Sequence, residues 1–187
     1  GVSQLQALSL PPHTSRRRSE SLELLSWLNT HIKGLDDQIE AVANAHPDAR
    51  RLMTHPGVGP LYGLATVLVL GPVTRFPTSK HVVSYVGLAP AIESSAGKHR
   101  LGRITKQGNA LLRYLLGHAG QAAIKRDADL KRLYYAVLHR RGRSRAKVAV
   151  ARKLLVRLYI MLRDEIDYRT FLDRAPAARR KEMPATT

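Results

Sequence analysis

The chain has 187 residues, 44% of them apolar, so we expect one domain, or a small domain with an extension, that buries a core. The absence of cysteine excludes disulfides, thiolate zinc sites and cysteine catalysis. The longest apolar run, residues 64–70, is too short to cross a bilayer, and no signal peptide is recognisable. We therefore expect a cytoplasmic protein with no membrane partner. Because the chain opens with Gly1 rather than Met, we also expect a processed product or a piece of a longer protein.

The positive charge is concentrated in the second half of the chain. The formal net charge is +17. Residues 1–90 carry 8 Lys/Arg and 6 Asp/Glu, a net +2, whereas residues 91–187 carry 23 and 8, a net +15. A charge block of this size repels itself unless a polyanion neutralises it. The predicted partner is therefore a nucleic acid, which would place the protein at the nucleoid. A solubilising surface or a patch for anionic membranes is the alternative.

The N-terminal part is expected to hold a linker and then a long helix. Residues 1–18 contain Pro11 and Pro12 without periodicity, which predicts a linker or a truncated end. Residues 19–46 repeat apolar side chains in steps of three and four, the heptad pattern of a coiled coil. The predicted seam consists of Leu25, Leu28, Ile32, Leu35, Ile39 and Val42. We predict a homo-oligomer that forms through this helix; one amphipathic helix packed on its own domain is the alternative.

Residues 47–172 are expected to form a compact helical domain with a helix-hairpin-helix element near its start. A short helix over residues 48–55 and an apolar helix over residues 61–70 flank the turn Gly57-Val58-Gly59. Glycines let the backbone approach a phosphate closely, and the N–H groups of the next helix N-terminus bind the anion. The three turn residues are therefore candidate nucleic-acid contacts. A tight helix–helix turn without a ligand is the alternative.

Further helices are predicted over residues 80–86, 110–125, 129–139 and 145–165, and a disordered tail over residues 173–187. Ser79 and Asn109 are the predicted N-caps of the first two. A basic run, residues 140–145, separates the last two helices. Because no segment shows sustained alternation with a period of two, the predicted fold class is all-α.

The basic loop over residues 94–109 is the candidate site for chemistry. It places Ser94 and Ser95 beside cationic side chains that suit a DNA phosphate. The candidate nucleic-acid contacts are Lys98, Arg100, Arg103, Lys106, Asn109 and, in the helix that follows, Arg113. A serine nucleophile needs a base or strong electrostatic activation. Taken alone, the residues favour phosphate binding over a catalytic serine.

No metal site or cofactor is predicted in this chain. A two-metal nuclease centre needs three or four convergent carboxylates, and only Glu93 lies near the basic loop. The eight histidines show no metal-ligand spacing. Residues 92–99 also lack the spacing of a phosphate-binding P-loop, because Ile92 and His99 stand where Gly and Ser/Thr are required.

A longer string of motifs resembles a known family. These motifs are Pro56-Gly57-Val58-Gly59-Pro60, Arg75-Phe76-Pro77, Tyr85-Val86-Gly87-Leu88-Ala89-Pro90, Ser94-Ser95-Ala96-Gly97-Lys98 and Gly102-Arg103-Ile104-Thr105-Lys106-Gln107-Gly108-Asn109. In this order they closely resemble the C-terminal domain of the DEDD transposases of insertion-sequence family 110/1111, a group that includes the pilin-gene-inverting recombinases. The resemblance runs from about residue 50 to residue 159.

The resemblance implies a transposase or site-specific recombinase. In this family a RuvC-like domain with four acidic ligands holds Mg²⁺, a coiled coil follows, and a serine of the C-terminal domain attacks DNA; some members use a structured guide RNA. The family serine maps onto Ser95, although Ala96 stands where the family has Gly. Since no acidic tetrad precedes the coiled coil, we expect a C-terminal part that binds nucleic acid and does not cleave efficiently alone. A non-catalytic helix-hairpin-helix module from a truncated transposon is the alternative.

Overall fold

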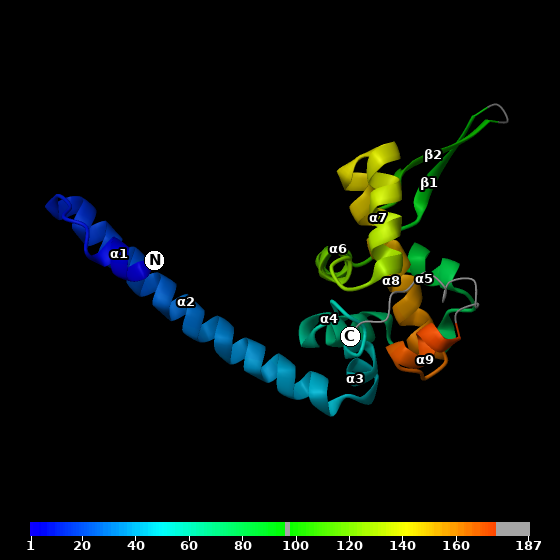
Figure 1. Ribbon diagram of the computed structural model, residues 1–187, viewed down its shortest axis with the longest axis horizontal. Coiled ribbons are helices and arrows are strands. Elements are labelled where there is room, and N and C mark those ends of the chain that lie inside the picture. The colour runs from blue at the N-terminus through cyan, green and yellow to red at the C-terminus, as the bar shows by residue number, and fades with distance from the viewer. Residues whose placement is uncertain (96–97, 175–187) are drawn as a thin grey trace. The chain divides into compact units, whose positions relative to one another are not determined.

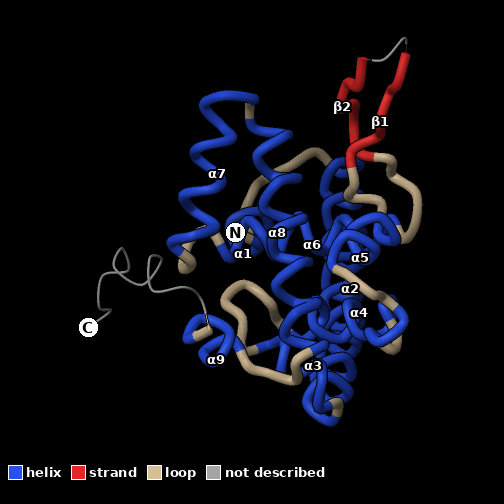
Figure 2. The backbone as a smooth tube through the Cα atoms, turned by 90° about the vertical axis from the view of Figure 1, so that its right-hand side faces the viewer, coloured by secondary structure: helices blue, strands red, loops and turns tan. Residues whose placement is uncertain are grey.

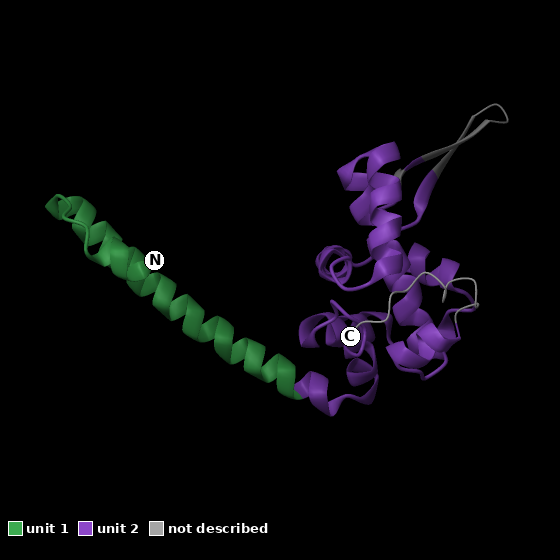
Figure 3. Cartoon of the chain, viewed as in Figure 1, with its two compact units in different colours: residues 1–41 green, residues 42–187 purple. Residues whose placement is uncertain are grey.

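The computed structural model describes residues 1–95 and 98–174, without the side chains of residues 92–95, 98–101 and 103 (Figure 1). Helices account for most of the described residues, which confirms the all-α fold class. The chain divides into two compact units, residues 1–41 and residues 42–187 (Figure 3). None of the described helices is long and apolar enough to cross a membrane. All but the first two residues of the predicted disordered tail lie outside the described range.

The first unit holds the short helix α1 (Val2–Gln6) and most of α2 (Pro12–Ala45). Helix α2 therefore begins seven residues before the predicted start, within the segment expected to be a linker. Proline is compatible with the first turn of a helix because the N–H that it lacks would have no intrahelical acceptor there. The guanidinium of Arg18 then donates to the carbonyls of Leu5 and Leu8, 3.1 and 2.7 Å away, and ties α1 to α2.

The predicted heptad seam lies on the surface of α2. Leu25, Leu28, Ile32, Leu35 and Val42 are 41–59% exposed. An exposed stripe of this spacing is the surface that a partner helix covers in a coiled coil. The coiled coil itself stays a prediction.

The second unit is a helical domain with one β-hairpin among its described residues (Figure 2). Its elements are α3 (Pro47–Met53), α4 (Pro60–Leu70), the 3-10 turn η1 (Val73–Arg75), α5 (Ser79–Val86), β1 (Pro90–Ser95), β2 (Lys98–Ile104), α6 (Ala110–Ala123), α7 (Ala128–Arg141), α8 (Arg143–Arg163) and α9 (Tyr168–Asp173). The predicted helices are present, with ends that shift by one to two residues. Thr78, rather than Ser79, occupies the N-cap position of α5.

Helix α8 is the centre of the core and packs against α3, α5, α6 and α7. One side of it is almost wholly buried: Val150, Leu154, Leu155, Leu158 and Met161 are each at most 1% exposed. Each such side chain contributes roughly 1.5–3 kcal/mol of hydrophobic stabilisation. Helix α6 approaches α8 closely at Gly120, where an added Cβ would lie 3.1 Å from the side chain of Val150. Of the apolar side chains that the helical periodicity places on the inward faces of these two helices, Leu111 is 60% exposed and Val148 is half-buried, and the others are buried.

The segment expected to be a basic loop forms an antiparallel hairpin instead. In its register Ile92 pairs with Leu101, Glu93 with Arg100, and Ser95 with Lys98. The polar and glycine residues of both segments hide any alternation, so the strands leave no period-two signal in the sequence. The hydrogen-bonded ladder between the two segments stabilises them.

A buried polar cluster joins α7, α8 and α9. The Arg157 guanidinium, 2% exposed, donates to the carboxylate of Asp127 and, at 3.2 Å, to that of Asp129. Asp127 also caps α7 by accepting from the N–H of Leu130 at 2.8 Å, and accepts from the hydroxyl of Tyr168. Burial raises the pKa of Asp127, but the charge of Arg157 and the hydrogen bonds from Tyr168 and Leu130 lower it by more. The pKa therefore lies below its ordinary value. This cluster fixes α9 to the domain.

Candidate nucleic-acid interface

The Gly57-Val58-Gly59 turn lies between α3 and α4, as predicted, but it is packed from behind by α6. Gly57 has φ +88°, and a Cβ there would lie 2.5 Å from the backbone nitrogen of Ala123 and 2.8 Å from the carbonyl of Ala119. Glycine is therefore required for backbone packing at this position. Val58 is 5% exposed and belongs to the core. Its N–H donates to the carbonyl of His55 at 3.1 Å, so the side chain and the N–H of Val58 are both engaged inside the protein.

Gly59 is the residue of this turn best placed for a phosphate. It is the N-cap residue of α4, its φ of −91° is ordinary, and Pro60 follows at the first helical position. No acidic residue lies in the first turn of α4. The N-terminus of a helix carries a partial positive charge and free N–H groups, both of which favour an anion.

The loop between β2 and α6 holds the base of the hairpin against α5. Lys106 has φ +57°, in the left-handed region that side chains other than glycine rarely adopt, and its N–H donates to the carbonyl of Gly87 at 3.2 Å. An added Cβ at Gly87 would lie 1.7 Å from the carbonyl of Gln107, and one at Gly108 would lie 2.0 Å from the carbonyl of Tyr85. This close backbone packing determines where the exposed Lys106 side chain leaves the surface.

Asn109 and Arg113, two further predicted contacts, have structural roles at the same place. The Asn109 side chain accepts from the N–H of Leu112 at 2.9 Å and caps α6, as predicted. The Nη1 of Arg113 donates to three carbonyls, those of Val86, Gln107 and Gly108, at 3.0–3.2 Å. Arg113 therefore joins the end of α5 to the start of α6 and brings a fixed positive charge to this part of the surface.

The remaining predicted residues belong to the hairpin. Ser95 is the last residue of β1 and pairs with Lys98, the first residue of β2; Arg100 and Arg103 follow along β2. The side chains of these four residues lie outside the described residues. The backbone register nevertheless brings Ser95 and Lys98 to the same end of the hairpin, far from its base at Ile104.

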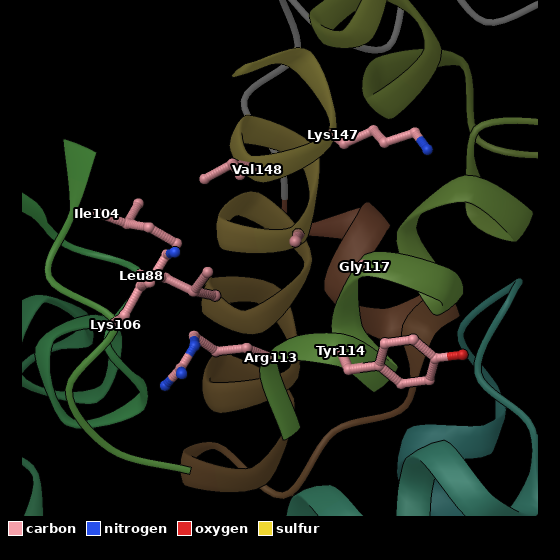
Figure 4. Close-up of a pocket in the computed structure, with 9 residues that line it drawn as sticks. Leu88, Ile104, Lys106, Arg113, Tyr114, Gly117, Lys147 and Val148 are labelled. Atoms are coloured by element: carbon pink, nitrogen blue, oxygen red, sulfur yellow. The ribbon is translucent and has the colours of Figure 1, made fainter. Parts of the chain in front are cut away.

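A pocket of about 370 Å³ lies at the base of the hairpin (Figure 4). Val148 and Ala151 of α8 form its floor. Lys147 of α8 lines it as well. Helix α6 and the chain on either side of the hairpin supply the rest of the lining, which consists of Leu88, Ile104, Lys106, Arg113, Tyr114 and Gly117. Among the described lining residues there are three cations and no carboxylate. The pocket thus joins two predicted contacts, Lys106 and Arg113, to residues that the sequence did not single out.

The turn between α7 and α8, which the sequence predicts only as a separator of two helices, is a cationic surface feature. Arg140, Arg141, Arg143 and Arg145 are all exposed around Gly142, which has φ +82°. In the ribbon view and in the turned view, this turn and the hairpin project from the same end of the second unit (Figures 1 and 2). The local density of arginine was the signal that could have identified it as part of an interface.

Within the described parts of the chain, no three His, Asp or Glu side chains come together in a way that could hold a metal ion. The described residues therefore do not fit Mg²⁺.

Comparison with known proteins relates this helical, cation-rich chain to a transposase family. Residues 49–136 match the family model described as Transposase IS116/IS110/IS902 family, and this match includes the turn, the hairpin and α6. The chain belongs to this family.

Similar curated proteins come from several bacteria. The transposase for insertion sequence element IS1111A of Coxiella burnetii is 36% identical over 88% of this chain and 46% of its own length. A probable family 20 transposase of Pseudomonas aeruginosa is 32% identical over 86% of this chain and 48% of its own length. The pilin gene-inverting protein of Moraxella lacunata is 28% identical over 80% of this chain and 51% of its own length. The chain spans about half the length of these relatives, and the family resemblance drawn from its motifs is confirmed.

Proposed function

We propose that this chain is the DNA-binding, serine-bearing part of a transposase, and that Ser95 is the nucleophile for strand cleavage and exchange. The observation that carries the proposal is the family match over residues 49–136, which contains the Gly57–Gly59 turn, the hairpin and six of the nine residues that line the cationic pocket. The position of Ser95 beside Lys98 in the hairpin register supports the choice of this serine.

The proposed step is a phosphoryl transfer to serine. The Ser95 hydroxyl gives its proton to a general base, and Oγ forms a bond to the phosphorus of a DNA phosphodiester. The P–O bond to one deoxyribose breaks, and its oxygen takes up a proton and leaves as a hydroxyl. The other strand end stays attached as a phosphoserine ester, so rejoining to a new hydroxyl is the reverse reaction. Cations beside the phosphate, Lys98 and Arg100 among them, would stabilise the charge that develops on its oxygens.

The basic half of the chain would hold the DNA backbone. The net charge of +15 on residues 91–187 and the exposed arginines of the α7–α8 turn support this role. The affinity would then fall steeply with salt, with a slope of log Kd against log salt of roughly 0.9 per phosphate contacted. We also propose a structured guide RNA as a second partner and a homo-oligomer built through the exposed seam of α2. A monomer at micromolar concentration in light scattering would rule out the oligomer.

The test is a covalent-adduct assay with serine variants. The protein, extended to the full length of its relatives, is incubated with labelled DNA of its insertion element and then denatured. We expect a denaturation-resistant protein–DNA species that Ser95→Ala abolishes and that Ser94→Ala, the neighbouring control, retains. An undiminished adduct in Ser95→Ala contradicts the assignment. If salt-dependent binding occurs and the extended protein forms no adduct at all, the chain is the non-catalytic binding module considered above.

A further inference from the structure

The pocket at the base of the hairpin has the size and lining of a ligand site. Its volume of about 370 Å³ lies in the range of small-molecule sites. Apolar side chains of Leu88, Ile104, Val148 and Ala151 line it. Gly117 adds to the open space, because nothing lies within 4 Å of where its Cβ would be. A flat apolar group of moderate size therefore fits against this surface.

The charged groups of the pocket favour an anion. Lys106, Arg113 and Lys147 all line it, and the described lining holds no carboxylate to neutralise them. One of these cations, Arg113, is held in place by its three carbonyl acceptors. A phosphate bound there would meet one charge that is already positioned, which lowers the entropic cost of binding.

Tyr114 supplies an exposed aromatic ring at the edge of the pocket. Its residue is 63% exposed although the ring is large, and its nearest aromatic neighbour is His118, with ring centroids 4.4 Å apart. Tyr114 and Lys147 lie on one side of the pocket, with Leu88, Ile104 and Lys106 on the other (Figure 4). An exposed tyrosine beside cations is the usual platform on which proteins stack an unpaired base.

We propose that this pocket binds one unpaired nucleotide of a DNA strand. The base lies against the apolar floor and stacks on Tyr114, and the adjoining phosphate lies near Lys106 and Arg113. A base that remains paired in a duplex already has both faces stacked, so only an unpaired base offers a face to the tyrosine. The inference rests on the proposed function, because a transposase acts on DNA. It adds a distinct element: a site that holds a strand open beside the hairpin that bears Ser95.

The experiment compares two DNA duplexes of the same sequence, one fully paired and one with a single unpaired 2-aminopurine. We expect the chain to bind the second more tightly and to quench its fluorescence. Tyr114→Ala should weaken binding of the unpaired-base duplex roughly fivefold to a hundredfold and remove the quenching, since stacking on an aromatic ring contributes about that much per base. Binding of the paired duplex should change little. Tyr114→Phe, which keeps the ring, should behave as the wild type.

Tyr135→Ala is the matched control, because Tyr135 is also exposed, at 45%, but lies on α7 away from the lining residues. The proposal is overturned if Tyr114→Ala and Tyr135→Ala have the same effect, or if the wild type shows no preference for the unpaired base. It is also overturned if a Tyr114-dependent preference is seen only with single-stranded RNA of the same sequence. A wild-type chain that binds neither duplex at low salt contradicts the proposed function itself, so the two failures are distinguishable.

Discussion

Protonation of His55 is expected to make the stability of the second unit depend on pH. His55 lies just before the Gly57–Gly59 turn and is 1% exposed. Its Nδ1–H donates to the carbonyl of Pro56 at 2.9 Å, and its ring packs on Tyr168 with centroids 4.4 Å apart. Its Nε2 is buried and finds no hydrogen-bond partner among the described residues. The folded state therefore accommodates a neutral imidazole and has no acceptor ready for a second proton.

The size of the effect follows from the pKa of this histidine. The pKa is lowered from 6.5 to about 4. Burial is the main cause and the charge of Arg157 acts in the same direction, whereas the Pro56 carbonyl and Asp127 oppose the shift. Between pH 6.5 and pH 4 the unfolded chain therefore binds a proton that the folded protein does not. The free energy of unfolding should fall as the pH falls through this window, by about 3 kcal/mol in all. The pKa of Asp127 lies below its ordinary value, so its contribution is lost only at still lower pH.

Urea unfolding at pH 7, 6, 5 and 4.5, followed by circular dichroism, measures the slope of the unfolding free energy against pH. His55→Asn keeps a donor near the position of Nδ1 but does not titrate. We expect it to be less stable than the wild type at pH 7 and to lose most of the slope below pH 6.5. His139→Asn, at an exposed position of α7, should retain the full slope. If His55→Asn unfolds with the same pH dependence as the wild type, the burial argument is wrong.

Two further predictions concern packing, both measured by urea unfolding. Gly57→Ala should cost about 2–4 kcal/mol, because the Cβ meets the backbone of α6 and the residue has φ +88°. Gly117→Ala, at a glycine of α6 with open space where the Cβ would be, should be neutral or stabilising. Equal losses of unfolding free energy in the two variants would refute the packing role of Gly57. Asp127→Ala should cost about 3–5 kcal/mol by leaving the buried Arg157 without its main partner. Asp129→Ala should cost less since that side chain is 27% exposed, and the reverse order would contradict this account.

The helical part of this structure was largely predictable from local sequence. Apolar residues at helical spacing identified α4, α6 and α8 and most of their buried faces, because a helix repeats within a few residues and needs no distant partner. The Asn109 cap was predicted for the same reason, since its acceptor lies three residues from the donor. The charge asymmetry and the motif string pointed to a nucleic-acid partner and to the transposase family that the comparisons confirm.

The start of α2 and the hairpin were not predictable in the same way. Pro11 and Pro12 predict a linker in the sequence, although proline is also favoured in the first turn of a helix, where Pro12 begins α2. The strands β1 and β2 depend on hydrogen bonds across the hairpin, which neither segment reveals alone.

Contacts between distant residues were decided only by the tertiary structure. Arg157 lies 30 residues from Asp127, and His55 lies far along the chain from Tyr168, yet each pair is packed together in the interior. The sequence determined that Gly57 stands in a turn, but only the structure shows why the residue must be glycine: a Cβ there would meet the backbone of α6. The pocket likewise exists only because α6, α8 and the base of the hairpin meet. A sequence pattern records the residues of one element, whereas burial and charge placement arise when several elements pack together.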